Sequence, residues 1–104
     1  MFARHVSIHL KSNMLSDYTR TFENDTLPLL RQQKGFNDEI TLSNPGSLDV
    51  IAISLWESKA NAETYNTNTY PQVLRTLERM IDGAPKVQTF EAVTSTFHKL
   101  AVAA

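Results

Sequence analysis

The clearest structural signal in the chain is Ile51-Ala52-Ile53-Ser54-Leu55-Trp56-Glu57-Ser58, where a strand pattern runs directly into a helix start. Alternate residues of a strand point to opposite faces. The branched aliphatic side chains therefore share one face, and the small, polar and aromatic ones share the other: Ile51, Ile53 and Leu55 against Ala52, Ser54 and Trp56. We expect helices to cover the aliphatic face. The face that ends at Trp56 suits the lining of a cavity.

Similar patterns place the other elements around this strand. Strand-like alternation covers residues 2–11, 36–43, 48–57 and 87–96, and helical periodicity covers residues 14–33, 59–66 and 70–81. The turn sequence Asn44-Pro45-Gly46-Ser47 predicts a hairpin between the second and third strands. This order predicts an α+β, ferredoxin-like split βαββαβ fold: a four-stranded antiparallel sheet with its helices on one face.

The first helical segment contains a proline that complicates its course. Asn13 is a candidate N-cap for this helix. Pro28 cannot donate a hydrogen bond to the carbonyl four residues back. The helix therefore either kinks there, or ends near Asn24 and restarts with Thr26 as its cap. Gly35 is expected to stop it, because glycine tolerates the positive φ that commonly follows a helix.

Composition narrows the class of protein. The 104 residues suffice for one domain, residues 1–104, with a core over 2–94 and a C-terminal tail over 97–104. The net charge is −1 and no basic stripe is visible, so neither nucleic acid nor an anionic membrane is an expected partner. The absence of cysteine excludes disulfides and thiolate sites. No signal-peptide pattern or run of ~20 apolar residues is present, so a cytoplasmic protein is expected.

The face that the helices leave open is predicted to carry mixed side chains: His5, Ser7, His9, Glu39, Thr41, Val50, Ala52, Ser54 and Trp56. A solvated sheet face would carry more charge. No element remains in the chain to cover it, so a second copy is the expected partner, in a two-fold homodimer with a small cavity in each subunit. The alternative is a monomer with an ordinary antiparallel face.

Five stretches carry a resemblance to a known family: Gln33–Phe36, Ile51–Ser58, Asn61–Tyr65, Thr69–Leu74 and Val87–Val93. They form a helix ending in Gly plus an apolar residue, a strand ending Trp-Glu-Ser, a Tyr-bearing helix, and a final strand with an aromatic–Glu pair. This pattern, over about residues 2–94, resembles the antibiotic biosynthesis monooxygenase (ABM) domain of the dimeric α/β-barrel superfamily.

The resemblance implies a homodimeric oxidoreductase, a monooxygenase that needs no cofactor and takes a small apolar, aromatic or polyketide-like ligand. In such enzymes Tyr, Trp, Asn and His side chains hold a phenolic anion that can itself pass an electron to oxygen. Two alternatives stay open, because the superfamily has many functions. One is a non-catalytic dimer that binds a small ligand or serves in stress response. The other is an isomerase or lyase that uses a cavity His or Glu as base.

The resemblance also selects candidate site residues. The candidate catalytic residues are His5, His9 and Trp56, and the candidate substrate-binding residues are Ser7, Ser54, Tyr65 and Tyr70, with Asn66 and Asn68 between the two tyrosines. Trp56 either contacts substrate or is a packing anchor. Tyr65 likewise either lines the cavity or packs.

His5 and His9 lie four residues apart on one strand, and so about 13 Å apart. They cannot share a metal ion, whose ligands lie about 2 Å away, and no metal site is expected. Each either shuttles a proton or is hydrogen-bonded at the dimer seam. In family members the tail that holds His98 can reach the partner chain.

Glu39, Glu57 and Glu91 are the notable carboxylates. Glu91 lies among valines, so it is either a proton acceptor or an edge residue that pairs with Arg4 or Lys11.

Cofactor sites are not expected. Haem-degrading members of the superfamily bind iron through a His one helix after the Trp, and residues 57–68 contain no His. No Gly-rich loop is present that could hold the phosphates of a nucleotide.

Overall fold

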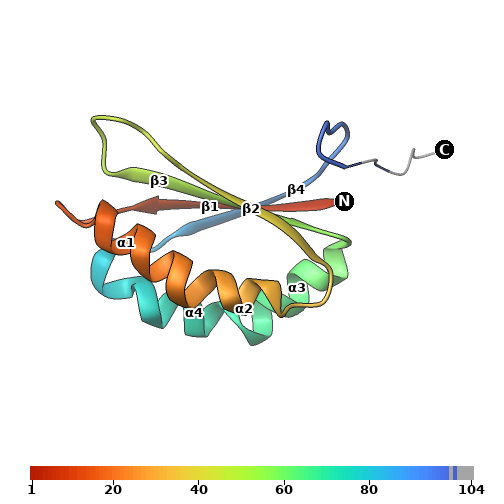
Figure 1. Cartoon of the computed structure of the whole chain (residues 1–104), viewed down its shortest axis with the longest axis horizontal. Coiled ribbons are helices and arrows are strands. Elements are labelled where there is room, and N and C mark those ends of the chain that lie inside the picture. Colours follow the sequence, from red (N-terminus) through yellow and green to blue (C-terminus); the bar gives the residue numbers. More distant parts are fainter. Residues whose placement is uncertain (99, 101–104) are drawn as a thin grey trace.

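The computed structural model describes residues 1–98 and 100, and it shows one sheet with all helices on one side (Figure 1). In chain order the elements are β1 (Phe2–His9), α1 (Leu15–Thr21), η1 (Phe22–Thr26), α2 (Leu27–Arg31), β2 (Phe36–Ser43), β3 (Asp49–Trp56), α3 (Lys59–Asn68), α4 (Tyr70–Leu77), η2 (Glu78–Met80) and β4 (Lys86–Glu91). The order of elements agrees with the prediction. However, β4 ends at Glu91 instead of near residue 96, and residues 99 and 101–104 of the predicted tail lie outside the described residues.

The sheet has the strand order β2-β3-β1-β4, and all neighbouring strands are antiparallel. β1 and β2 therefore run parallel with β3 between them, and β3 and β4 run parallel with β1 between them. Each crossover carries helices onto the same face of the sheet (Figure 1). The predicted ferredoxin-like βαββαβ class is confirmed.

The predicted orientation of β3 is wrong. Its register pairs Trp56 with Phe2, Ser54 with Arg4 and Ala52 with Val6, which places these residues on one face. That face lies under the helices, where Val50, Ser54 and Trp56 are buried. The aliphatic set Ile51, Ile53 and Leu55 lies on the opposite face. We call this face, which the helices do not cover, the open face.

A packing difference explains the orientation of β3. Large aromatic side chains from the helices, among them Tyr18 and Tyr65, pack onto the sheet. Small residues such as Ala52 and Ser54 leave them room, as interdigitated layers at native density require. Glu39 and Thr41 of β2 were also predicted on the open face, but they pair with Ser54 and Ala52 and so belong to the helix-covered face.

The orientation predicted for β1 is right. Val6, Ile8 and Leu10 are buried under the helices, at 2–6% exposure. His5, Ser7 and His9 lie on the open face. The core therefore lies between the sheet and the helical layer. No helix within residues 1–98 has the length and apolar character needed to cross a membrane.

The first helical segment is continuous from Leu15 to Arg31, with a π-helical turn at η1. Thr26 has helical φ and ψ, so the helix does not restart there, and Pro28 sits in the first turn of α2, directly after the π turn. The wider turn accommodates a residue that has no N–H to donate. Asn13 is not the N-cap, because its φ is +61° and Met14 occupies the cap position.

The second helical segment follows the prediction more closely. Ser58 caps α3, its hydroxyl accepting a hydrogen bond from the Asn61 backbone N–H at 3.2 Å. α3 runs to Asn68, beyond the predicted residue 66, and the break before α4 is Thr69 alone. Pro71 lies in the first turn of α4, as predicted.

Gly35 fixes the approach of the β2 start to α3. Its φ is +78°, and a Cβ there would lie 2.8 Å from the Asn61 Cβ. We expect Gly35→Ala to lower the free energy of unfolding by about 1–3 kcal/mol more than Gly46→Ala does. Gly46 is the matched control because its φ is +80° with no atom within 4 Å, so only the backbone cost applies. Urea denaturation measures both, and equal losses would contradict the close contact.

Candidate functional site

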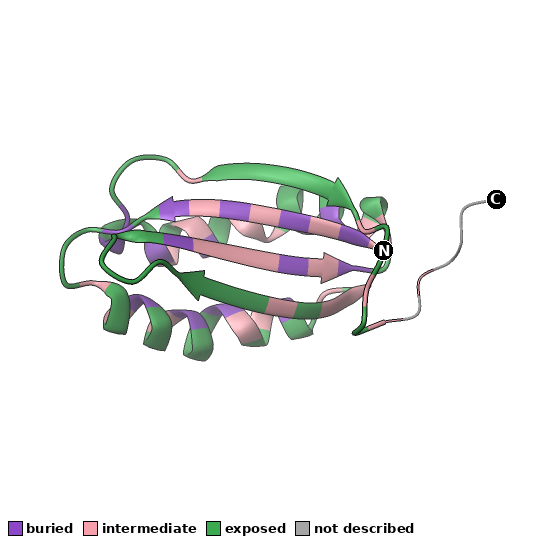
Figure 2. Ribbon diagram, turned by 90° about the horizontal axis from the view of Figure 1, so that it is seen from above, coloured by how far each residue is buried: buried purple, intermediate pink, exposed green. Residues whose placement is uncertain are grey.

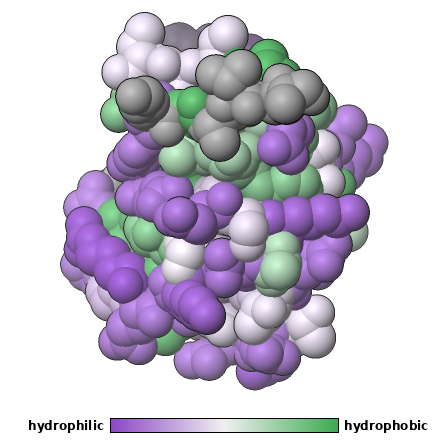
Figure 3. All heavy atoms as spheres, turned by 90° about the vertical axis from the view of Figure 1, so that its right-hand side faces the viewer, coloured by the Kyte–Doolittle hydropathy of each residue, from purple (hydrophilic) through white to green (hydrophobic). Residues whose placement is uncertain are grey.

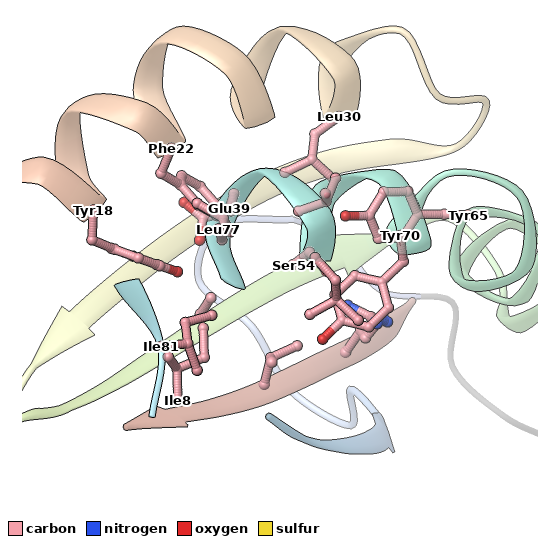
Figure 4. A pocket seen from close by; sticks show the side chains of 15 residues that line it. Ile8, Tyr18, Phe22, Leu30, Glu39, Ser54, Tyr65, Tyr70, Leu77 and Ile81 are labelled. Carbon is pink, nitrogen blue, oxygen red and sulfur yellow. The ribbon is translucent and has the colours of Figure 1, made fainter. Parts of the chain in front are cut away.

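A small cavity lies between the sheet and the helical layer (Figure 4). We call it the inner cavity. Its walls are mainly aliphatic side chains from β1 and α4, and polar groups occur only at certain points. Those polar groups come from Arg4, Tyr18, Glu39, Ser54, Tyr65 and Tyr70. The volume open to a water-sized sphere is ≈ 30 Å³, enough for one or two water molecules.

Arg4 supplies the positive charge of the inner cavity. Arg4 is buried, with only 3% of the residue exposed. The guanidinium carbon lies 3.9 Å from the Tyr70 ring centroid and 5.2 Å from that of Tyr65. One Nη donates to the Asn66 Oδ1 at 2.8 Å, while Nε has no partner among the described residues. A planar donor group is therefore buried with part of its hydrogen-bonding capacity unused.

Tyr18 and Glu39 lie at the end of the cavity away from Tyr65 and Tyr70 (Figure 4). Tyr18 is fully buried, and its hydroxyl has no hydrogen-bond partner in the described part of the chain. Glu39 accepts a hydrogen bond from the Thr41 hydroxyl at 2.7 Å. Burial raises the pKa of Glu39, and the Thr41 hydrogen bond opposes this shift. Glu39 is thus a carboxyl group that takes up a proton more readily than an exposed one.

The tyrosine hydroxyls stay protonated at neutral pH. Burial raises the pKa of Tyr65 to about 12, although the charge of Arg4 acts in the opposite direction. Burial also raises the pKa of Tyr18 and of Tyr70, and Arg4 again opposes the shift at Tyr70. These side chains are donors at neutral pH, which leaves Glu39 as the carboxylate in the cavity lining.

An outer groove adjoins the inner cavity between α1 and β2. The two share the side chains of Tyr18, Phe22 and Glu39, and the groove has a volume of ≈ 320 Å³. Sites for small organic ligands usually span about 300–1,000 Å³, so the inner cavity alone is too small for an aromatic ligand. The stacked rings of Tyr18 and Phe22, with centroids 5.8 Å apart, separate the two spaces. They lie on α1 and on the π-helical η1.

Trp56 packs behind the cavity instead of lining it. The residue is fully buried, with Phe36 edge-on at 5.5 Å and Tyr65 at 5.1 Å between ring centroids. Its indole N–H donates to the Ser54 hydroxyl at 2.8 Å. Trp56 therefore fixes two residues that do line the cavity, Ser54 and Tyr65. Of the two interpretations of Trp56 from sequence, the structure agrees with the packing anchor.

The histidines lie on the other side of the sheet from the inner cavity. His9 forms a 2.8 Å contact with Asp49, and both side chains are more than half exposed to solvent. His5 packs edge-on against Phe90, with ring centroids 6.1 Å apart. His98 contacts Asp38 of β2. The sequence predicted one lining shared by His5, His9, Trp56, Tyr65 and Tyr70, and this grouping is wrong, because the sheet separates the histidines from the tyrosines.

The other predicted residues divide in the same way. Ser7 lies on the open face, and Ser54, Tyr65 and Tyr70 line the inner cavity. Asn66 reaches the site through its bond to Arg4. Glu91 is an exposed residue on the edge strand β4, with no ion pair to Arg4 or Lys11 among the described residues. Asn68 and Glu57 are exposed and do not line the cavity.

Sequence reasoning missed Arg4, Tyr18 and Phe22 as site residues. A signal for Arg4 was present, because it alternates with Phe2, Val6 and Ile8 on the helix-covered face of β1. A charged residue in such a set must find compensation inside the protein. Within residues 1–98, no three His, Asp or Glu side chains lie together as metal ligands would.

The open face is strongly apolar. Ile40, Leu42 and Phe90 are 47–52% exposed, and Ile51, Ile53 and Leu55 between them are half-buried. Figure 2 looks onto this face and shows its outer strands mostly exposed. In Figure 3, hydrophobic side chains are visible around the middle of the upper half, on the side of the sheet, and the lower half is mainly hydrophilic. Contiguous exposed apolar surface of this kind marks an interaction site.

No protein-family model matches this chain, and no curated protein matches it by sequence. Solved structures do. The chain is similar to SnoaB, a cofactor-independent oxygenase from Streptomyces nogalater, with 11% identity and a TM-score of 0.76 over 91% of this chain and 95% of that one. It is also similar to the NE2512 protein of unknown function from Nitrosomonas europaea, with 14% identity and a TM-score of 0.76 over 98% and 95%. A crystallised antibiotic biosynthesis monooxygenase gives 11% identity and a TM-score of 0.72 over 90% and 100%.

These likenesses confirm the fold expected from the resemblance. The chain has the fold of antibiotic biosynthesis monooxygenases. At 11–14% identity they carry no information about its reaction.

The raised pKa of Glu39 predicts a pH-dependent cost in stability. Native Glu39 holds its proton more tightly than the unfolded chain does, so the native protein loses stability as pH rises above 4.5, the ordinary value. Glu39→Gln removes this loss. We expect the free energy of unfolding of the variant, relative to that of the unchanged protein, to increase as the pH rises from about 4 to about 8. Urea denaturation at both pH values measures it, with the exposed Glu78→Gln as control. A difference that stays constant or shrinks with pH would exclude a partly buried carboxylate that destabilises the native protein.

Proposed function

We propose that the protein is an ABM-like monooxygenase that oxidises a small hydroxylated aromatic compound without a cofactor, in the inner cavity enlarged toward the outer groove. The observation that carries the proposal is the composition of that cavity: one carboxyl group with a raised pKa, tyrosine hydroxyls as donors and a buried cation, within aliphatic walls. The fold shared with SnoaB, a cofactor-independent oxygenase, supports it.

Glu39 is the general base in this proposal, in place of His5 or His9. Burial raises the pKa of Glu39. Its proton affinity is therefore closer to that of a phenolate than the affinity of an exposed carboxylate is. Tyr65, Tyr70 and Ser54 orient the ring through their hydroxyls, and Trp56 acts as a positioning residue through Ser54. The aliphatic walls exclude water from the reactive anion.

The reaction balances without a further reductant. Glu39 takes the phenol proton, and the phenolate transfers an electron to O₂. The resulting superoxide and phenoxyl radical join through a C–O bond at a ring carbon, and Glu39 returns its proton to the peroxide. The hydroperoxide then loses the proton on that carbon and breaks its O–O bond, and the released hydroxide and this proton form water beside the quinone. The substrate is oxidised by four electrons, and O₂ accepts all four.

The dimer belongs to the same proposal. The open face is apolar and exposed, and helices from the described chain lie only on the other side (Figure 1). A second copy is the occupant we propose, because a two-fold dimer brings identical faces together and Ile40, Ile53 and Phe90 pack well against their own kind. His9 and Asp49 lie near the edge of that interface and His5 nearer its middle.

An isomerase or lyase is the second candidate. It is favoured by the same Glu39, since a carboxylate of raised pKa in an apolar cavity can also remove a proton next to a carbonyl group. Such a reaction consumes no oxygen.

The test is a screen of hydroxylated aromatic compounds under air with an oxygen electrode, with mass spectrometry of the products and no added flavin, metal or nicotinamide. We expect one O₂ consumed per quinone formed. Product formation without oxygen uptake would support the isomerase or lyase and refute the oxygenase.

A further inference from the structure

We propose that Arg4 is the anchor for a carboxylate group of the ligand, so that the inner cavity selects aromatic carboxylates over their neutral analogues. The inference rests on the proposed function for the place where the ligand binds. It adds the chemical class of that ligand, which neither the fold nor the comparisons supply.

The burial of Arg4 requires an explanation. A guanidinium stays charged at any pH that proteins meet. Moving such a charge out of water costs on the order of several kcal/mol unless an anion compensates it. Two carboxylates line spaces that Arg4 also lines: Glu39 in the inner cavity and Glu63 in a groove between α3 and β4. Among the described residues neither forms an ion pair with Arg4, and Glu63 pairs with Lys59 at 3.8 Å.

The neutral partners of Arg4 compensate only part of this cost. The rings of Tyr70 and Tyr65 contribute a cation–π interaction, about 2 kcal/mol when desolvated. Asn66 accepts one hydrogen bond and Nε makes none within the described residues. Carboxylates match the forked donor geometry of arginine, and such pairs are among the strongest hydrogen bonds in proteins. A carboxylate of the ligand would therefore compensate the charge of Arg4 and accept from its Nε–H.

The surrounding walls define the rest of the ligand. Val6, Val73 and Leu77 make the middle of the cavity apolar, and Tyr65 and Tyr70 place flat rings beside the guanidinium. Tyr18 and Glu39 lie at the far end, where they can meet a hydroxyl group (Figure 4). A hydroxylated aromatic carboxylate satisfies both ends. Its ring exceeds the inner cavity, so we expect Tyr18 and Phe22 to move toward the outer groove when it binds.

The first experiment is isothermal titration with benzoate and with benzamide, a neutral analogue of nearly the same shape, at constant ionic strength and without oxygen. We expect benzoate to bind about tenfold or more tightly than benzamide. Arg4→Gln should remove this preference, whereas Arg75→Gln, an exposed arginine on α4, should retain it. Ala52→Leu, which fills the inner cavity, should abolish binding, and Thr89→Val in the α3–β4 groove should not.

The second experiment uses the unchanged chain, and it stays informative if Arg4→Gln does not fold. The NMR signal of the Arg4 Nε–H should move downfield on addition of benzoate and stay in place with benzamide. Equal binding of the two compounds, no binding of benzoate up to about 10 mM, or an unmoved Nε–H signal at saturation would each overturn the proposal. Because binding is measured without oxygen, a protein that binds benzoate but consumes no O₂ refutes only the oxygenase.

Discussion

Trp56→Ala should lower the free energy of unfolding by about 3–5 kcal/mol, the range for removing a large buried aromatic side chain. The residue is fully buried and contacts the rings of both Phe36 and Tyr65. Its removal leaves a cavity and also leaves the Ser54 hydroxyl without its donor. A domain of this size has a total stability of about 5–15 kcal/mol, so the loss is a large share of it. Urea denaturation followed by circular dichroism measures the effect, since Trp56 is the only tryptophan.

The control for this prediction is Trp56→Phe. Phenylalanine keeps a ring between Phe36 and Tyr65 but cannot donate to Ser54, so it should lose about 1–3 kcal/mol. Val93→Ala changes a side chain that is 82% exposed and should have no measurable effect. A loss below about 1 kcal/mol for Trp56→Ala would show that the indole is not a packing anchor.

Ile53→Glu should convert a dimer into a monomer. Ile53 lies in the middle of the open face, paired with His5 on one side and Ile40 on the other. In the proposed dimer, residue 53 would be buried against the second copy. A buried unpaired carboxylate costs on the order of several kcal/mol. This cost should weaken association by about 100-fold or more. Light scattering at micromolar concentration should give about twice the 11.7 kDa chain mass for the unchanged protein. The variant should give the chain mass.

Leu15→Glu is the matched control, because Leu15 is 46% exposed but lies on α1, on the other side of the molecule. It should remain dimeric. Circular dichroism should show that Ile53→Glu keeps its secondary structure, because Ile53 is half-buried on the open face and lies outside the core between the sheet and the helices. A monomeric unchanged protein, or an Ile53→Glu variant with the dimer mass, would contradict the proposed interface.

The order of the elements was predictable because each has a local cause. The alternation in residues 36–43, the hydroxyl of Ser58 as helix cap and Pro71 in a first helical turn act within a few residues. The course of the helix around Pro28 was left open, because a π turn and a restarted helix both satisfy a residue without an N–H.

The faces of β3 were not predictable in the same way. Alternation shows which residues share a face, but the face that helices cover depends on the size of the helical side chains that arrive there. Aliphatic residues such as Ile53 were assigned to the core, although a second subunit can bury them equally well. The candidate site was misplaced for this reason, because His5 and His9 were grouped with tyrosines that lie across the sheet.

The central claim is that chemistry takes place on the helix-covered side of the sheet, with Glu39 as the base. The most direct measurement compares oxygen consumption of Glu39→Gln with that of His5→Asn and His9→Asn, on the best substrate of the aromatic screen. We predict that Glu39→Gln loses about 100-fold or more, the usual contribution of a general base, and that both histidine variants stay within about threefold of the unchanged protein. A full-rate Glu39→Gln variant, or a comparable loss in either histidine variant, would contradict the account.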